Sequence, residues 1–238
     1  MKTKTLDYAQ GADFEARVRA DYAAQRILIV RQFPLHSREE LLAFIGLFGV
    51  PQKEPYGSAS DYFHTLRAEE QPLIDHKGDV ITSSTNHVFG LHTDNYNKGP
   101  KAPTIGLLCV TPARVGGESH IARLSHVLEQ LTPDTIAEMK RRAWPHPTGP
   151  IALLDTGGIR YNRSTIEAFA KALQTPLSAR QIEVMDRVDE AAGAVKQALR
   201  LDRQEMLVLD NLTFLHGRSA FEPGSEREFV RWRINEAT

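Results

Sequence analysis

Cysteine is nearly absent from this sequence, with Cys109 the single one among 238 residues. One cysteine excludes an intramolecular disulfide, and its position in the apolar run Ile105–Val110 predicts a buried thiol. No apolar stretch approaches the roughly 20 residues of a membrane-spanning helix. The charged start Met1–Tyr8 has no hydrophobic segment behind it that would indicate a secretory signal. We therefore expect a cytoplasmic protein that has no membrane partner.

A long run of basic residues is also absent. The chain has 29 Lys and Arg against 30 Asp and Glu, a formal net charge of -1, which gives no electrostatic reason to expect a nucleic-acid partner. There are no internal repeats and no low-complexity linker, and the length suits one sizeable core. We expect one domain over residues 1–238, and no feature indicates an oligomeric state.

Helical and strand patterns alternate irregularly along the chain. Capping patterns begin three of the helices, at Ser37 with Glu40, at Thr132 with Pro133, and at Ser178 with Gln181. The expected helices are 13–26, 41–48, 124–131, 133–144, 165–173 and 178–201; the expected strands are 27–30, 104–110, 118–122, 205–211 and 227–234, with a hairpin over 151–161. Strands scattered between helices exclude a helix bundle and argue against regular βαβ alternation. The pattern favours a mainly β, α+β fold with a closed or sandwiched antiparallel core and a helical insertion around 124–201.

The most informative stretch is Leu91-His92-Thr93-Asp94. On a strand, residues two apart point to the same face, so His92 and Asp94 can hold adjacent positions on one metal ion. His216, which follows a long apolar segment, is the best third ligand. Two histidines and a carboxylate form the facial triad of non-haem Fe(II) oxygenases. A His-x-Asp pair also occurs by chance, so the interpretation depends on the residues around it.

Two further features accompany the histidines. Arg227 lies 11 positions after His216 and begins a strand on which Arg231 and Arg233 share its face. An inward guanidinium can bind a carboxylate through two parallel hydrogen bonds. The alternative, which applies to Arg233 more than to Arg227, is an exposed edge strand with solvated arginines. In the turn Gly116-Gly-Glu-Ser119, the Ser119 hydroxyl could bind the same carboxylate.

These motifs occur in one order along the chain: Ser83–Asn86, Leu91–Asp94, Gly116–Ser119, Leu209–Asn211, Leu215–Arg218 and Arg227. In that order and spacing, from about Ser83 to Arg233, the sequence resembles the clavaminate synthase/taurine dioxygenase-like family of Fe(II)- and 2-oxoglutarate-dependent oxygenases. The resemblance implies that His92, Asp94 and His216 bind Fe(II), and that Arg227 and Ser119 bind 2-oxoglutarate. It also implies a double-stranded β-helix, a jelly-roll, cupin-like core with flanking helices.

The resemblance further implies a reaction that consumes O2 and 2-oxoglutarate and releases succinate and CO2. Halogenating members have a small residue in place of Asp94, so hydroxylation or another oxidation is favoured here. Arg231 stands where some members place an arginine that faces the substrate. With Arg160 and Asn86 as further candidates, this favours a small polar substrate, such as an amino acid or related carboxylate.

Two other functional classes remain open at this stage. A cupin-like isomerase or hydrolase would use the metal without 2-oxoglutarate and would have no need of Arg227. A non-catalytic β-barrel binding protein would carry the histidines incidentally. Binding of 2-oxoglutarate and metal analysis distinguish the three classes.

Overall fold

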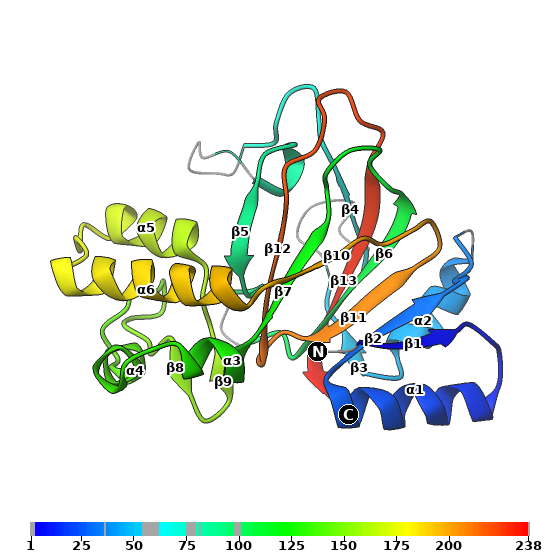
Figure 1. The fold of residues 1–238 in the computed structure, drawn as a ribbon, viewed down its shortest axis with the longest axis horizontal. Coiled ribbons are helices and arrows are strands. Elements are labelled where there is room, and N and C mark those ends of the chain that lie inside the picture. Colours follow the sequence, from blue (N-terminus) through cyan, green and yellow to red (C-terminus); the bar gives the residue numbers. More distant parts are fainter. Residues whose placement is uncertain are drawn as a thin grey trace.

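The structure is a computed structural model, which describes residues 3–35, 37–53, 62–74, 80, 82–97 and 101–237. The described residues form a mixed α and β fold in which two sheets lie face to face and helices cover both outer faces (Figure 1). Between the sheets, Ile105 and Phe229 from one sheet pack with Ile121 and Phe214 from the other. No helix in this part of the chain is long and apolar enough to cross a membrane.

The larger sheet has seven strands in the order β1-β2-β11-β6-β13-β3, and β4 also pairs with β13. Its strands are β1 (Lys4–Asp7), β2 (Ile27–Arg31), β3 (Gly49–Pro51), β4 (His64–Arg67), β6 (Thr104–Thr111), β11 (Met206–Asp210) and β13 (Glu228–Ala237). The pair β1–β2 is parallel and the other pairings are antiparallel. Gly106 is required at the centre of β6, because the Trp232 indole of β13 occupies the space of a Cβ there.

The smaller sheet carries the residues of greatest functional interest. It is antiparallel, in the order β10-β7-β12-β5. Its strands are β5 (Phe89–His92), β7 (Ser119–Arg123), β10 (Gln197–Leu199) and β12 (Phe214–Arg218). The register of β12 on β5 places His216 opposite His92. Two small elements lie outside these sheets. One is a short hairpin of β8 (Leu154–Asp155) and β9 (Gly158–Ile159), and the other is the 3-10 helix η1 (Thr82–Ser84).

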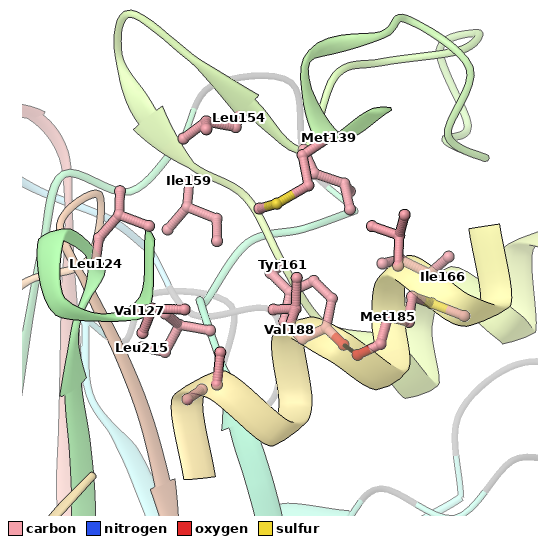
Figure 2. Packing of buried hydrophobic residues seen from close by; sticks show 14 of the residues in the cluster. Leu124, Val127, Met139, Leu154, Ile159, Tyr161, Ile166, Met185, Val188 and Leu215 are labelled. Carbon is pink, nitrogen blue, oxygen red and sulfur yellow. Dashed lines mark hydrogen bonds between the residues drawn. The ribbon is translucent and has the colours of Figure 1, made fainter. Parts of the chain in front are cut away.

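The helices form two groups, one on each side of the sheets (Figure 1). They are α1 (Ala12–Gln25), α2 (Arg38–Ile45), α3 (Leu124–Glu129), α4 (Pro133–Lys140), α5 (Arg163–Ala172) and α6 (Ala179–Val195). Phe14 of α1 and Phe44 of α2 pack with Val30 and Trp232 on the outer face of the larger sheet. The group α3–α6 packs on the smaller sheet around Val127, Met139, Ile166, Val188 and Leu215 (Figure 2). Both outer faces of the β core are therefore buried, which explains why most strands read as apolar runs.

Several sequence predictions need correction. The helix expected over 178–201 ends at Val195, where Lys196 turns extended, and the next three residues form β10 on β7. The helix expected over 133–144 ends at Lys140, and Trp144 forms an isolated bridge with Ile151 instead. Strands β1, β3, β4 and β12 were not predicted. β3 has three residues and β1 and β4 have four each, at or below the length at which a period of two can appear, and β12 is buried at all five positions and shows no alternation.

Candidate metal centre

His92, Asp94 and His216 meet on one face of the smaller sheet. His92 is the last residue of β5, Asp94 follows two positions later, and His216 lies within β12. Their ligand atoms all lie within 4.8 Å of one another, and all three residues are buried. The distances from Asp94 Oδ1 to His92 Nε2 and His216 Nε2 are 3.5 and 3.6 Å. The structure thus brings together the three residues that the sequence predicted as ligands.

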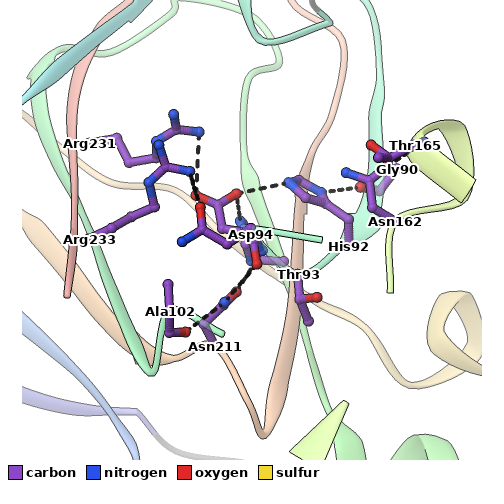
Figure 3. Close-up of polar contacts among 12 residues, drawn as sticks. Gly90, His92, Thr93, Asp94, Ala102, Asn162, Thr165, Asn211, Arg231 and Arg233 are labelled. Atoms are coloured by element: carbon purple, nitrogen blue, oxygen red, sulfur yellow. Dashed lines mark hydrogen bonds and ion pairs between the residues drawn. The ribbon is translucent and has the colours of Figure 1, made fainter. Parts of the chain in front are cut away.

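Neighbouring groups orient the ligands for a cation. His92 Nδ1 lies 2.8 Å from the Gly90 carbonyl oxygen, so Nδ1 donates its proton to this oxygen and Nε2 is the ring nitrogen that faces Asp94 (Figure 3). Burial, and then the nearby His92, lower the pKa of His216 to about 4, which keeps this imidazole neutral. Each imidazole therefore presents its Nε2 atom to a carboxylate oxygen in a buried place. A divalent transition metal fits this donor set, because imidazole nitrogen and carboxylate oxygen are both ligands that it binds.

The backbone of Asp94 is fixed by Asn211. The Asn211 Oδ1 accepts from the Asp94 N–H at 2.8 Å, and its Nδ2 donates to the carbonyls of Asp94 and Ala102 at 3.2 and 2.9 Å. Thr93 is held by Tyr161, whose carbonyl accepts from the Thr93 N–H at 2.6 Å and whose N–H donates to the Thr93 hydroxyl at 2.9 Å. Asn211 belongs to the Leu-Asp-Asn motif singled out in the sequence, but its part in the site was not predicted.

Two arginines of β13 neutralise the Asp94 side chain. Arg231 Nη1 and Arg233 Nη1 lie 3.4 and 3.5 Å from Asp94 Oδ2 (Figure 3). Burial alone raises the pKa of Asp94, but Arg231, the two histidines and Arg233 outweigh it and hold the pKa well below its usual value. Arg233 also donates to Asn95 Oδ1 at 2.7 Å. The exposed-edge interpretation of Arg233 is therefore wrong, because β13 is flanked by β6 on one side and by β3 and β4 on the other.

Arg227 lies in the cavity that adjoins the ligands. The cavity is lined by Ser119, Arg218, Arg227, Phe229 and Arg231 together with the three ligands. The Arg227 guanidinium carbon lies 4.0 Å from the ring centre of Phe229 and 5.3 Å from that of Phe221. Burial, and then Arg218, lower its pKa to about 9.

No carboxylate among the described residues pairs with this buried cation. An unpaired buried charge is costly, so the position calls for an anionic ligand. The glycine turn explains how Arg227 fits there. A Cβ at Gly117 would lie 3.0 Å from Arg227 Nε, and the φ of +73° at Gly117 also favours glycine. The turn therefore brings Ser119 to the cavity and makes room for Arg227.

Arg218 ends the motif Leu215–Arg218 singled out in the sequence, but its part in the site was not predicted. Its Nη2 donates to the carbonyls of Thr85 and His87 at 2.7 and 2.8 Å, which fastens the segment before β5 to β12. Burial lowers its pKa to about 10. The sequence could have indicated this role, because Arg218 lies two residues after His216, and residues two apart on a strand have their side chains on the same face.

The remaining substrate candidates lie in different places. Arg231 lines the cavity at the ligands. Asn86 does not line it, and donates to the Phe221 carbonyl at 3.1 Å. Arg160 lines a separate cavity, where its Nη1 lies 3.3 Å from His146 Nε2. Of the three, the structure brings only Arg231 to the candidate metal centre.

Comparison with protein families gives one match, to the model described as "Taurine catabolism dioxygenase TauD, TfdA family", over residues 2–233. No curated protein matches the sequence.

Several solved structures are similar in fold. An asparagine oxygenase in complex with Fe(II), 2S,3S-3-hydroxyasparagine and succinate is 16% identical with a TM-score of 0.70, over 92% of this chain and 79% of that one. The non-haem iron oxygenase OrfP in complex with Fe and alpha-ketoglutaric acid is 13% identical with a TM-score of 0.69, over 94% and 80%. PvcB from Pseudomonas aeruginosa is 18% identical with a TM-score of 0.63, over 92% and 79%. At these identities, the likeness establishes the fold.

Proposed function

Because this chain belongs to the TauD/TfdA family of dioxygenases and is thus an iron- and 2-oxoglutarate-dependent oxygenase, we propose that His92, Asp94 and His216 hold its Fe(II). We further propose that Arg227 and Ser119 hold 2-oxoglutarate, and that the enzyme hydroxylates a small polar substrate such as an amino acid or related carboxylate. Within the family's reaction, bound Fe(II) supplies the oxidising chemistry that couples hydroxylation by O2 to conversion of 2-oxoglutarate into succinate and CO2.

The observation that carries the proposal is the buried Arg227 beside the three ligands. Its guanidinium lacks a carboxylate partner among the described residues and lines the same cavity as the metal ligands. A dicarboxylate that reaches both the metal and Arg227 would supply the missing negative charge. The Ser119 hydroxyl on the same cavity wall would donate a further hydrogen bond to that carboxylate. A cupin-like isomerase or hydrolase would have no use for this arginine.

The chain's own residues would prepare the centre for the reaction. Gly90 fixes the tautomer of His92, and Arg231 and Arg233 keep Asp94 ionised as a ligand. Phe221 and Phe229 surround the Arg227 guanidinium and exclude water from it. Asp94 occupies the ligand position that a halide would need, which favours hydroxylation over halogenation.

The substrate class rests on Arg231 and on the neighbours. Arg231 lines the cavity at the ligands, where its guanidinium could bind a substrate carboxylate. The asparagine oxygenase structure contains a hydroxyasparagine, and an OrfP structure contains (3S)-hydroxy-L-Arg. Free amino acids are therefore the first substrates to test.

We also propose that the two facing sheets are a double-stranded β-helix, or jelly roll. In this arrangement, residues 1–238 form one domain with a helical insertion around 124–201. The side chains shared between the sheets and the register of β12 between β7 and β5 support this architecture.

The test is an anaerobic titration of the protein with Fe(II) and 2-oxoglutarate, followed by the weak visible charge-transfer band of the chelate. We expect the band with wild-type protein, and succinate release that depends on O2 and on an added amino acid. His92→Ala, Asp94→Ala and His216→Ala should abolish both while circular dichroism stays unchanged, because each removes one of three ligands. Full activity with iron still bound in any of the three would remove that residue from the metal centre.

A further inference from the structure

Arg218 is a buried cation to which the proposed function gives no task. The residue is 7% exposed and lines the cavity at the metal ligands. Among the described residues it has no carboxylate partner, and its Nε atom has no hydrogen-bond partner. Burying a guanidinium without a counter-charge is costly, so the position calls for an anion nearby.

The register of β12 places Arg218 between the two neighbouring strands. On one side it lies opposite Ser119 of β7, and on the other side it lies opposite Phe89 of β5. The guanidinium carbons of Arg218 and Arg227 lie 4.8 and 5.3 Å from the ring centre of Phe221. Arg218 thus shares one corner of the cavity with Ser119 and Arg227, the two residues proposed to hold 2-oxoglutarate.

The two guanidiniums repel each other in this corner. The charge of Arg218 is, after burial, the cause that lowers the pKa of Arg227. Like charges destabilise each other more strongly in a buried place than in water. A carboxylate in this corner offsets the repulsion and attracts both cations, so an anion bound by Arg227 also acts on Arg218.

The Arg218 guanidinium also holds the segment of the chain that leads into β5. Its Nη2 atom donates to the Thr85 and His87 carbonyls at 2.7 and 2.8 Å. A few positions further, the Phe89 ring stacks on the His92 imidazole, with the ring centres 4.0 Å apart. One guanidinium therefore connects the corner assigned to the cosubstrate with the residues beside a proposed metal ligand.

We propose that Arg218 is a positioning residue that couples 2-oxoglutarate binding to residues 82–89, here called the entry segment. The distal carboxylate of 2-oxoglutarate attracts the Arg218 guanidinium and keeps it where it holds the two carbonyls of the entry segment. The coupling is reciprocal, because a fixed entry segment keeps Arg218 in place and so tightens cosubstrate binding. The inference rests on the proposed binding of 2-oxoglutarate by Arg227 and Ser119.

Hydrogen–deuterium exchange of the anaerobic Fe(II)-loaded protein, with and without saturating 2-oxoglutarate, tests the coupling. In wild-type protein, we expect 2-oxoglutarate to slow amide exchange in the entry segment about five-fold or more, the lower end of typical coupling between two sites. The compound 2-oxobutyrate has the same metal-chelating group but lacks the distal carboxylate. At saturation it should therefore leave the exchange of the entry segment unchanged.

Variants of Arg218 separate this coupling from a purely structural role. In Arg218→Gln, the slowing by 2-oxoglutarate should be largely lost, and the Kd for 2-oxoglutarate from anaerobic calorimetry should rise about five-fold or more. Arg218→Lys keeps the charge but loses the planar set of donors, so it should retain part of the slowing. Arg19→Gln is the matched control and should behave as wild type. Arg19 also donates to a main-chain carbonyl, that of Leu47 at 2.8 Å, but lies outside the cavity.

Four outcomes would contradict the proposal. If Arg218→Gln speeds exchange equally with and without 2-oxoglutarate, Arg218 only holds the segment. Equal slowing by 2-oxobutyrate would show that metal chelation alone orders the segment. If 2-oxoglutarate binds, and Arg227→Lys weakens this binding, but the entry segment does not respond, the coupling is wrong while the proposed function stands. No binding of 2-oxoglutarate by wild-type protein overturns both. The wild-type measurements decide even if Arg218→Gln fails to fold.

Discussion

At the scale of single residues, the site depends on how positive charge is distributed around one carboxylate. Arg231 and Arg233 both approach Asp94, whereas Arg227, one residue before the strand that carries them, has no acidic partner in the described part of the chain. These three arginines are close together in the sequence but differ in the residues that they contact. Arg233 contacts Asp94 and Asn95, Arg231 contacts Asp94 from the cavity wall, and Arg227 is the residue that we propose to bind an anion.

Arg227→Lys should raise the apparent KM for 2-oxoglutarate about ten-fold or more, with a much smaller effect on the KM for the substrate. Lysine presents a point charge in place of a two-pronged guanidinium, and a charge-assisted hydrogen bond is worth about 1.5–3 kcal/mol. Steady-state kinetics with each reactant varied in turn measures the two constants. Arg233→Lys, in the strand that directly follows Arg227, is the matched control. If Arg233→Lys alone raised the cosubstrate KM, the assignment of Arg227 would be wrong.

Arg231→Ala should raise the KM for an amino acid substrate while the KM for 2-oxoglutarate changes little. The structure identifies Asp94 as an acid that Arg231 pairs with. This contact gives Arg231 a possible second role in keeping Asp94 ionised. Fe(II) affinity, measured beside the two KM values, separates the roles. A fall in Fe(II) affinity with an unaltered substrate KM would show that Arg231 serves only the metal ligand.

The three residues that meet at the candidate metal centre could be singled out from the sequence, because His92 and Asp94 stand in a short motif. His92 and Asp94 are two positions apart, and His216 follows a recognisable apolar segment. The partners of these residues were not predictable in the same way. The bond from Asn211 to Asp94 and the contact from Arg231 to Asp94 both depend on how distant strands align, and local patterns do not specify that alignment.

At the scale of elements, the pairing of β5 with β12 sets the distance between the two histidines. Gly217, next to His216, allows this pairing, because a Cβ there would lie 2.6 Å from the Phe89 carbonyl oxygen. Helices with side-chain caps were predicted close to their observed starts, since Ser37, Thr132 and Ser178 each cap a helix. The end of α6 was not, because Gln197–Leu199 form a strand only through pairing with β7. Tertiary pairing there overrides helix propensity.

Gly217→Ala should therefore weaken Fe(II) binding by roughly ten-fold or more, comparable to the loss of a group that orients a metal ligand. The added methyl group would push β5 away from β12 and separate His92 from His216. Fe(II) affinity measured anaerobically by competition with a chelator tests this expectation. Gly193→Ala in α6 is the control, since nothing lies within 4 Å of its Cβ position and alanine favours a helix. Equal Fe(II) affinities in the two variants would show that the β5–β12 spacing does not limit metal binding.

At the scale of the whole molecule, the metal centre lies in the smaller sheet, which is held between two apolar clusters. The cluster between the sheets fixes the smaller sheet to the larger one, and the α3–α6 cluster fixes its outer face. The sequence predicted a β core with helices around it, because apolar strands alternated with capped helices. It did not predict the four layers, because these depend on which strands become neighbours, as β11 does between β2 and β6.

Ligands that complete the charge balance of this core should stabilise the whole fold. Arg227 is buried without an acidic partner among the described residues, and the three proposed ligands present two imidazoles and a carboxylate to one point. A ligand that binds only the folded state stabilises it by about 2.7 kcal/mol at a concentration 100 times its Kd. Anaerobic Fe(II) should therefore raise the Tm measured by differential scanning calorimetry, and 2-oxoglutarate should raise it further. The chelator EDTA should reverse both increases, because the cosubstrate binds partly through the metal.

In Arg227→Lys, the increase in Tm with Fe(II) should remain and the increase with 2-oxoglutarate should be largely lost. An equal 2-oxoglutarate response in wild type and Arg227→Lys would place the cosubstrate elsewhere in the molecule.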